Sequence, residues 1–367
     1  MLTVVVAGAG IAGCAVAVAV HRAGHRAVVL EARPGGAADV GAFLVLASSG
    51  VRALDELGAL AEVDAVAGRL DGFVAQTSDG TVTVERPLGS GGPDYRYVRR
   101  AALCEALQRR VEELGIDLRR GARVVGTERH DGGVAALLDD GGRIEADLLI
   151  AADGLGSRRR AEVDPDGPPP RYAGQRVYYG RSPVTDVGRV HGFHSVNGGA
   201  AFGHIPTGSE TWWFCRVTAP PLAPGATVGD HRADVLDHVD GIAARLVTAT
   251  GVVVGVEARD LPFVSRWERD RVLLVGDAAH AASPASGQGG STALEDGVVL
   301  GKALRDTGDV DAAVALFTRC RAGRTQANVV ASARHTAGGD PVPDMPPGRA
   351  LDERELAAQL AWASPLT

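Results

Sequence analysis

LTVVVAGAGIAGCAVAVAVHRAGHRAVVLE, residues 2–31, carries the clearest structural signal in the chain. Residues 2–7 form a short β-branched apolar run of the kind that is buried in a parallel sheet. An alanine- and valine-rich stretch follows the glycines and ends near Ala23, where Gly24 is a natural helix C-cap. Residues 27–30 form a second buried strand that ends at Glu31. We therefore predict one strand–helix–strand unit for this segment.

The glycines of this unit are spaced for a dinucleotide. Gly8 permits a tight turn, Gly10 lets the backbone approach a pyrophosphate, and Gly13 lets the helix pack against the strand. Ile11 and Ala12 complete the turn between the last two glycines. Such glycine patterns also occur in plain turns, but the strand before and the helix after favour dinucleotide binding.

An acidic residue ends the second strand. Glu31 lies 18 positions after Gly13, which matches the acid that accepts a hydrogen bond from a ribose hydroxyl of a bound adenosine. Ala32 follows it, and Arg33 is placed to pair with phosphate or to cover adenine. These residues do not distinguish FAD from NAD.

A second apolar run, residues 271–275, ends in Gly276-Asp277. Ligands of open α/β sheets bind at the carboxyl ends of the strands, so we expect Asp277 to face the ligand crevice. A carboxylate there accepts hydrogen bonds from the hydroxyl groups of a polyol chain. The alternative is that Asp277 only caps the next helix.

A glycine-rich loop follows at residues 284–290, PASGQGG, and opens a helix that runs through Ala293, Glu295 and Asp296. Small residues with free N–H groups at a helix N-terminus suit an electron-rich ring edge that gains negative charge on reduction. The alternative is an ordinary loop before a capped helix.

In order and spacing these motifs resemble those of the class A, single-component FAD-dependent monooxygenases with the para-hydroxybenzoate hydroxylase fold, over nearly the whole chain. Residues 41–58 are similar to the family's segment along the isoalloxazine. Arg100 resembles the start of an R-x-x-L helix whose arginine contacts FAD phosphate, with Arg99 as a rival. Asp153-Gly154 resembles the D-G motif, which is associated with both FAD and nicotinamide handling.

The resemblance implies non-covalent FAD, with NADPH or NADH as co-substrate. The residues expected to bind FAD are Gly8, Gly10, Ile11, Ala12, Gly13, Glu31, Ala32, Arg33, Phe43, Arg100, Asp153, Gly154, Gly276, Asp277, Pro284, Gly287, Gln288, Gly289 and Gly290.

The fold class implied is α/β: a Rossmann-like (glutathione-reductase-type) FAD-binding domain with an inserted, mostly antiparallel β-sheet substrate domain. Aromatic residues between glycines in residues 172–262 fit such a sheet. The predicted division is 1–72, 99–164 and 263–337 for the FAD-binding domain, 73–98 for substrate-domain strands, 165–262 for the substrate-binding sheet, and 338–367 for a C-terminal connection and helix.

The function implied is hydroxylation or epoxidation of an aromatic or polycyclic small molecule, of the kind made in natural-product tailoring. In this family NAD(P)H reduces FAD, and O2 then forms a flavin C4a-hydroperoxide that delivers one oxygen atom. A same-fold oxidase, dehydrogenase or reductase is the alternative, and a non-catalytic flavin-binding module is a remote one. The W-x-W-x-I-P signature of flavin halogenases is absent. The sequence does not identify the substrate, the preferred nicotinamide co-substrate (NADH or NADPH) or the oligomeric state.

A phenolic substrate reacts faster as a phenolate, so a base in the substrate sheet would assist the reaction. His194, His204, Tyr178 and Tyr179 are the candidates, although each of these residue types more often has a packing or surface role. No catalytic residue is therefore assigned. His280 follows the G-D motif, and a structural or helix-capping role suits it at least as well as a catalytic one.

Composition excludes several function classes. The net charge of −7 does not favour nucleic acid or an anionic membrane surface. The four cysteines are far apart in sequence, which indicates neither a disulfide framework nor a metal site. No long uncharged apolar run suggests a membrane span, so we expect a cytoplasmic enzyme. Lys302 is the only lysine.

Overall fold

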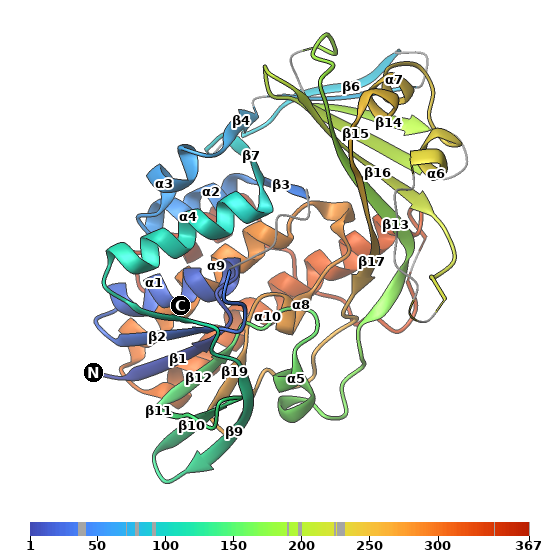
Figure 1. The fold of residues 1–367 in the computed structure, drawn as a ribbon. Helices are drawn as coiled ribbons and strands as arrows, with labels where there is room; N and C mark the ends of the chain where they lie inside the picture. Colours follow the sequence, from blue (N-terminus) through green and yellow to red (C-terminus); the bar gives the residue numbers. More distant parts are fainter. Residues whose placement is uncertain are drawn as a thin grey trace.

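The computed structural model describes residues 1–35, 42–70, 72–77, 81–89, 93–188, 191–196, 200–223, 225, 232–340 and 342–366. Of Gln76 and of residues 191–196 it describes the backbone only. Figure 1 shows two lobes, one built on a mainly parallel sheet and one on a large antiparallel sheet. This arrangement confirms the predicted fold class.

The first lobe is organised by a six-stranded sheet in the order β18-β19-β12-β1-β2-β8. Its strands are β1 (Thr3–Ala7), β2 (Arg26–Glu31), β8 (Asp117–Arg120), β12 (Leu148–Ala151), β19 (Val272–Leu274) and β18 (Glu268–Arg269). All pairs are parallel except β18 with β19. The central β1 is buried, as expected for a strand covered on both faces.

Helices cover this sheet. They are α1 (Ile11–Arg22), α4 (Arg100–Glu113), α9 (Gly289–Thr307) and α10 (Val310–Thr336), with α2 (Ser48–Glu56), α3 (Leu60–Asp64) and α5 (Arg158–Val163) at the margins. Two glycines of α9 allow it to lie directly on α1. A Cβ at Gly297 would be 2.6 Å from the backbone carbon of Ala15, and one at Gly301 would be 2.6 Å from the Cβ of Ala19.

Two small sheets belong to the same lobe. One contains β9 (Val124–His130), β10 (Gly133–Leu138) and β11 (Arg143–Ala146). The other has the order β3-β7-β4 and contains β3 (Phe43–Leu46), β4 (Gly68–Leu70) and β7 (Tyr95–Arg99). The second of these sheets lies on the side of the lobe that faces the large sheet (Figure 1).

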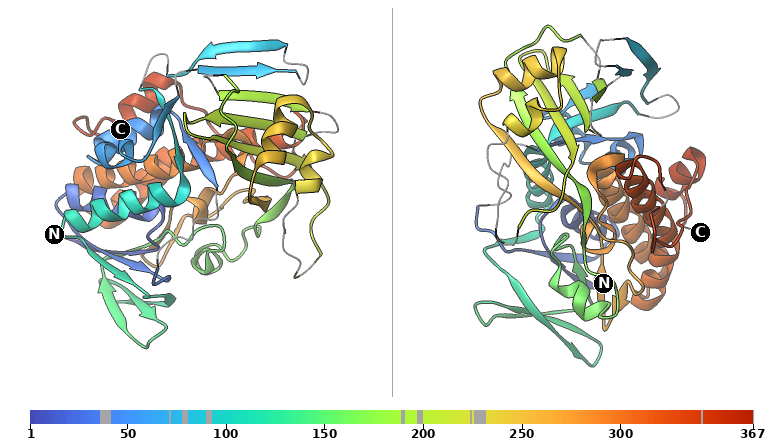
Figure 2. Two further views of the ribbon diagram at one scale, coloured as in Figure 1. Left: turned by 45° about the horizontal axis from the view of Figure 1, so that its top comes forward. Right: turned by 90° about the vertical axis from the view of Figure 1, so that its right-hand side faces the viewer.

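The second lobe is a seven-stranded sheet in the order β17-β13-β16-β15-β14-β5-β6. Its strands are β5 (Gly72–Gln76), β6 (Val82–Pro87), β13 (Arg171–Ser182), β14 (His191–Val196), β15 (Ala200–Pro206), β16 (Thr211–Thr218) and β17 (Val253–Asp260). Only β14 and β5 pair in parallel. Helices α6 (Arg232–Leu236) and α7 (Gly241–Ala249) cover one face of it (Figure 2).

The segment predicted to supply substrate-domain strands, residues 73–98, is divided between two sheets. Strands β5 and β6 join the seven-stranded sheet, whereas β7 pairs with β3 and β4. The boundaries between the six predicted segments stay a prediction.

The C-terminal helix α11 (Glu353–Leu360), red in Figure 2, is held on the first lobe by the only lysine of the chain. A capping box between Asp352 and Glu355 starts the helix. At its end, the buried Lys302 Nζ of α9 donates to the carbonyls of Gln359 and Ala361, both at 2.7 Å. These carbonyls have no helical partner, so Lys302 acts as an internal C-cap.

We expect Lys302→Met to destabilise the fold by about 1–3 kcal/mol, because two partly buried carbonyls lose their charged donor. Denaturant unfolding measures the loss, and hydrogen exchange should locate it in α11. Arg158→Met, an exposed change on α5, is the control. Unchanged exchange in α11 would contradict the assigned capping role.

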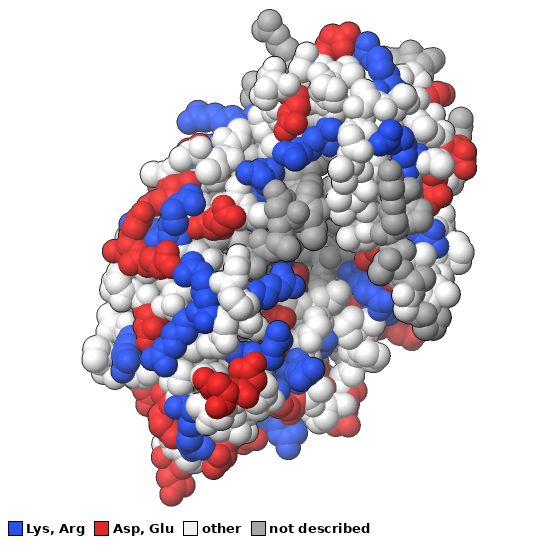
Figure 3. All heavy atoms as spheres, in the orientation of Figure 1, with Lys and Arg blue, Asp and Glu red and all other residues white. Residues whose placement is uncertain are grey.

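Both signs of charge are interspersed over the face shown in Figure 3, which agrees with the modest net charge. Among the described residues there is no helix that could span a membrane and no His, Cys, Asp and Glu cluster suited to a metal ion.

Candidate functional site

The glycine turn between β1 and α1 has the geometry that the sequence predicts. Gly8 has φ of +111°, and a Cβ there would lie 2.5 Å from the carbonyl oxygen of Ala152. A Cβ at Gly13 would lie 1.9 Å from the carbonyl oxygen of Gly8. By contrast, a Cβ at Gly10 would meet no atom within 4 Å. Two glycines are thus required by packing, and the third borders open space.

Glu31 holds the turn from the end of β2. Its carboxylate accepts hydrogen bonds from the backbone N–H of Ala9 at 2.9 Å and of Arg33 at 2.8 Å. Gln108 of α4 also contacts the turn, since its Nε2 donates to the Ala9 carbonyl at 2.9 Å. Sequence reasoning missed Gln108 because no motif marks it.

The G-D turn lies against this glycine turn. Gly276 has φ of +58°, and a Cβ there would be 2.6 Å from the Cβ of Ala12 in the first turn of α1. Asp277 is exposed and begins the short helix α8 (Asp277–His280). Two segments far apart in sequence therefore lie side by side.

A fully buried network of charged residues supports the G-D turn from behind. Asp296 Oδ2 accepts from the Gly276 N–H at 2.9 Å and lies 2.7 Å from His280 Nε2. Its other oxygen accepts from Arg321 Nε at 2.8 Å. Arg321 also pairs with Glu295 at 2.9 Å. The turn that presents Asp277 is thus anchored to α9 and α10 through Asp296.

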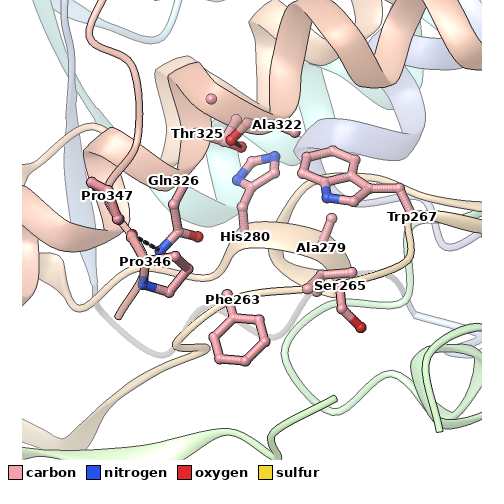
Figure 4. Close-up of a pocket in the computed structure, with 12 residues that line it drawn as sticks. Phe263, Ser265, Trp267, Ala279, His280, Ala322, Thr325, Gln326, Pro346 and Pro347 are labelled. Atoms are coloured by element: carbon pink, nitrogen blue, oxygen red, sulfur yellow. Dashed lines mark hydrogen bonds between the residues drawn. The ribbon is translucent and has the colours of Figure 1, made fainter. Parts of the chain in front are cut away.

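His280 has a structural position at the end of α8. Its ring stacks on Trp267, with centroids 5.9 Å apart, at the wall of a cavity of about 330 Å³ (Figure 4). On the opposite wall, Gln326 donates to the Pro346 carbonyl at 3.1 Å.

The glycine-rich loop forms a short 3₁₀ helix, η2 (Pro284–Ser286), and continues into α9. Gly287 has φ of +65°, which favours glycine. Gln288 is the N-cap of α9 but makes no side-chain capping bond. A Cβ at Gly289 would meet nothing within 4 Å, and one at Gly290 would lie 3.4 Å from Leu46 of β3. The loop and β3 are therefore neighbours.

Two further motifs concern Arg100 and Asp153-Gly154. Arg100 is exposed at the first position of α4, and its N–H donates to the Ala42 carbonyl at 3.0 Å. Arg99, the rival for the same role, is the N-cap of α4 and is half-buried.

Asp153 is exposed after β12, and Gly154 has φ of +78°. Arg160 links this segment to α8, because its guanidinium donates to the carbonyls of Leu155 and Ala278 at 2.7 and 3.3 Å. Burial lowers the pKa of Arg160, although Asp153 opposes this effect.

Aromatic side chains fill the space between β3 and the seven-stranded sheet. The Phe43 ring lies 5.6 Å from Trp212, 6.0 Å from Tyr179 and 6.3 Å from Phe214, measured between centroids. A Cβ at Gly203 would be 2.4 Å from the Phe214 ring, so only glycine leaves room for that ring. We call Phe43, Tyr179, Trp212 and Phe214 the aromatic wall.

Arg216 lies on the same sheet face as this wall. Side chains alternate along a strand, so Trp212, Phe214 and Arg216 of β16 point to one side. The guanidinium is mostly buried, and burial lowers its pKa. Burial also raises the pKa of the neighbouring Tyr179 to about 12, although Arg216 opposes this. Tyr179 therefore stays protonated near neutral pH and is a hydrogen-bond donor rather than a base.

The other proposed bases lie elsewhere. Tyr178 faces the opposite side of the sheet, where its hydroxyl donates to Asp234 at 3.1 Å. His204 pairs with Trp213 on that same face and lies 3.4 Å from the Val187 carbonyl. Helices α6 and α7 cover this face. The sheet itself therefore separates Tyr178 and His204 from the aromatic wall. The His194 side chain lies outside the described residues.

A family model described as an FAD binding domain matches residues 1–328. The chain belongs to the FAD-dependent monooxygenase family. Aurachin C monooxygenase/isomerase of Stigmatella aurantiaca is 31% identical over 344 residues, which cover 91% of this chain and 88% of that protein. The 3-amino-4-hydroxybenzoate 2-monooxygenase of Streptomyces cremeus is 33% identical, with 98% and 94% covered.

A solved structure agrees. Klebsiella pneumoniae HpxO, complexed with FAD and uric acid, matches this monooxygenase with a TM-score of 0.81 and 28% identity, over 91% of this chain and 88% of that one. The predicted family, fold and FAD cofactor are therefore confirmed, and NAD(P)H use is typical of the family.

The residues of the monooxygenase groove fit FAD. The open spaces beside Gly10 and Gly289 lie at the N-termini of α1 and α9, where neither helix has a side-chain cap. Uncapped N–H groups and the helix dipole favour phosphate at one end and an electron-rich ring at the other.

Proposed function

We propose that this monooxygenase uses NAD(P)H and O2 to insert oxygen into an aromatic or polycyclic small molecule held against the aromatic wall. The observation that carries the proposal is the position of Phe43. This residue lies on β3, whose Leu46 contacts the flavin-facing loop at Gly290, while its ring contacts the substrate sheet. A flat substrate at the wall would thus lie next to the flavin ring.

The FAD-binding residues proposed from the sequence would hold the cofactor along its length. Glu31 would hold the adenosine ribose, the turn with Gly10 the pyrophosphate, and Asp277 the ribityl chain. Gly289 and Gly290 would place backbone N–H groups at the flavin ring. Bound there, FAD supplies the redox and oxygen chemistry, so the protein needs no nucleophile.

The chain's own residues position the substrate and exclude water. The aromatic wall offers flat faces for stacking, and its burial keeps the reacting region dry. The Arg216 guanidinium and the Tyr179 hydroxyl are donors on the same face, and a desolvated guanidinium favours an anionic oxygen. We therefore propose an aromatic substrate that carries a phenolate or carboxylate.

Anaerobic spectra test the proposal. The purified yellow protein should bleach when NADPH or NADH is added, and ¹⁸O₂ should then place one labelled oxygen in a phenolic substrate. Reduction without label in the product would favour the oxidase or dehydrogenase reading. A related Aspergillus protein is named notoamide E oxidase and is 28% identical, so this outcome has a precedent among the relatives.

We expect Arg216→Met to raise KM for a phenolic or carboxylated aromatic by about tenfold or more, since a charged hydrogen bond contributes about 1.5–3 kcal/mol. FAD content should not change. Arg245→Met, which removes an exposed guanidinium on α7, is the matched control. Equal effects of the two substitutions on KM would show that Arg216 does not contact substrate.

A further inference from the structure

A second cavity, of about 410 Å³, lies beneath the C-terminal helix and includes none of the four residues of the aromatic wall in its lining. Its walls come from α2, η2, α10, α11 and Tyr95 of β7, and it adjoins the flavin-facing loop through Ser286 and Gln288. The size falls within the range of small-molecule sites.

Asn328 of α10 supplies an unsatisfied donor to this cavity. The residue is 5% exposed and lines the cavity, yet its Nδ2 has no hydrogen-bond partner among the described residues. Buried polar atoms in native proteins almost always have a partner. The missing partner is therefore expected to come from a molecule in the cavity.

The charges around Asn328 select an anion. Arg52 of α2 and Arg324 of α10 both line the cavity. Within the described residues, Arg52 has no carboxylate partner, and the buried Nε of Arg324 has no acceptor. The acidic residue in the lining, Glu353, is exposed on α11. The cavity thus has two positive charges and an amide donor against one negative charge that is exposed to solvent, so its electrostatic potential favours an anion.

The C-terminal segment contributes an apolar side to the cavity through Leu351, Leu356 and Leu360. An occupant must therefore combine an anionic head with an apolar body. We propose that this cavity binds a small organic monocarboxylate whose head contacts Asn328, Arg52 and Arg324 and whose chain packs under α11. No site residue proposed for the substrate is shared with it.

Binding at the cavity is connected to the cofactor groove. Arg324 donates to Glu295 at 3.1 Å, and Glu295 pairs with Arg321, which bonds Asp296 behind the G-D turn. A carboxylate at Arg324 competes with Glu295 for this guanidinium. Occupancy should therefore change the visible spectrum of the bound flavin as well as release heat.

Octanoate is the probe, because an aliphatic chain cannot stack on the aromatic wall. Calorimetric titration of the FAD-loaded protein should show saturable binding with a small flavin difference spectrum. Asn328→Leu and Arg52→Met should each weaken binding at least tenfold, whereas Arg216→Met should leave it unchanged. Equal melting temperatures and far-UV circular dichroism spectra verify that all variants fold.

Three results would overturn the proposal. If octanoate does not bind, the cavity does not take an anionic ligand of this class. Binding that is lost in Arg216→Met but kept in Asn328→Leu places the anion on the aromatic wall. Octylamine that binds in place of octanoate assigns the cavity to a cation at Glu353. None of these results depends on oxygen insertion, so the monooxygenase proposal is tested separately.

Discussion

The Gly10→Val variant is expected to fold normally and to purify without FAD. A Cβ at Gly10 meets no protein atom within 4 Å, so the fold has room for the new side chain. Its methyl groups would nevertheless fill the space beside the uncapped N-terminus of α1, which we assign to the pyrophosphate. The visible flavin absorbance should be absent, while far-UV circular dichroism should match the wild type.

Gly13→Val is the contrasting variant. A Cβ there would lie 1.9 Å from the Gly8 carbonyl oxygen, so the backbone must move and the protein should lose stability as well as FAD. Gly10→Ala, with a single methyl group, should retain part of its FAD. Full FAD content in Gly10→Val would show that the pyrophosphate does not bind at this turn.

Asp296→Asn is expected to lower the free energy of unfolding by about 3–5 kcal/mol, because Arg321 keeps its buried charge but loses one of its two carboxylates. The turn at Gly276 also loses a charged acceptor, so FAD should dissociate more readily. Denaturant unfolding and FAD titration measure the two effects. Asp186→Asn, which breaks an exposed pair with Arg245, should change neither.

The cost of this substitution should depend on pH. Burial raises the pKa of Asp296, but His280 and Arg321 lower it more, to about 2. A depressed carboxyl pKa stabilises the fold above the unfolded value, and this stability is lost as the pH falls through the folded value. The difference between wild type and Asp296→Asn should therefore shrink by roughly 2 kcal/mol between about pH 4 and pH 2. A difference that is independent of pH would contradict the ion pairing.

The cofactor groove was predictable because its motifs are local. Gly13 is required by its close approach to Gly8 within one turn of the chain, and that turn leaves a fixed spacing in the sequence. Gly8 is required by its positive φ and by the distant Ala152. The structure confirms the fold and places the G-D turn against the glycine turn, while the individual FAD contacts remain proposals.

The substrate face was not predictable, because Tyr178 and Tyr179 are adjacent aromatic residues that point to opposite sides of one strand. When both sides of a strand are buried, alternation cannot identify the side that faces the flavin.

The buried network escaped prediction for a related reason. Glu295 and Asp296 resemble exposed helix charges, and only the packing of α10 against α9 buries them with Arg321. Their position inside the apolar run of residues 293–300 was the available signal.

The contact between α1 and α9 determines when the enzyme can acquire its cofactor during synthesis. The first helix of the chain rests on Gly297 and Gly301, and β1 needs β12 as a neighbour. Until residues 289–307 have left the ribosome, the glycine turn at the start of the chain has no completed groove. FAD capture is thus a late event, and the nascent N-terminal segment must remain protected from aggregation until then.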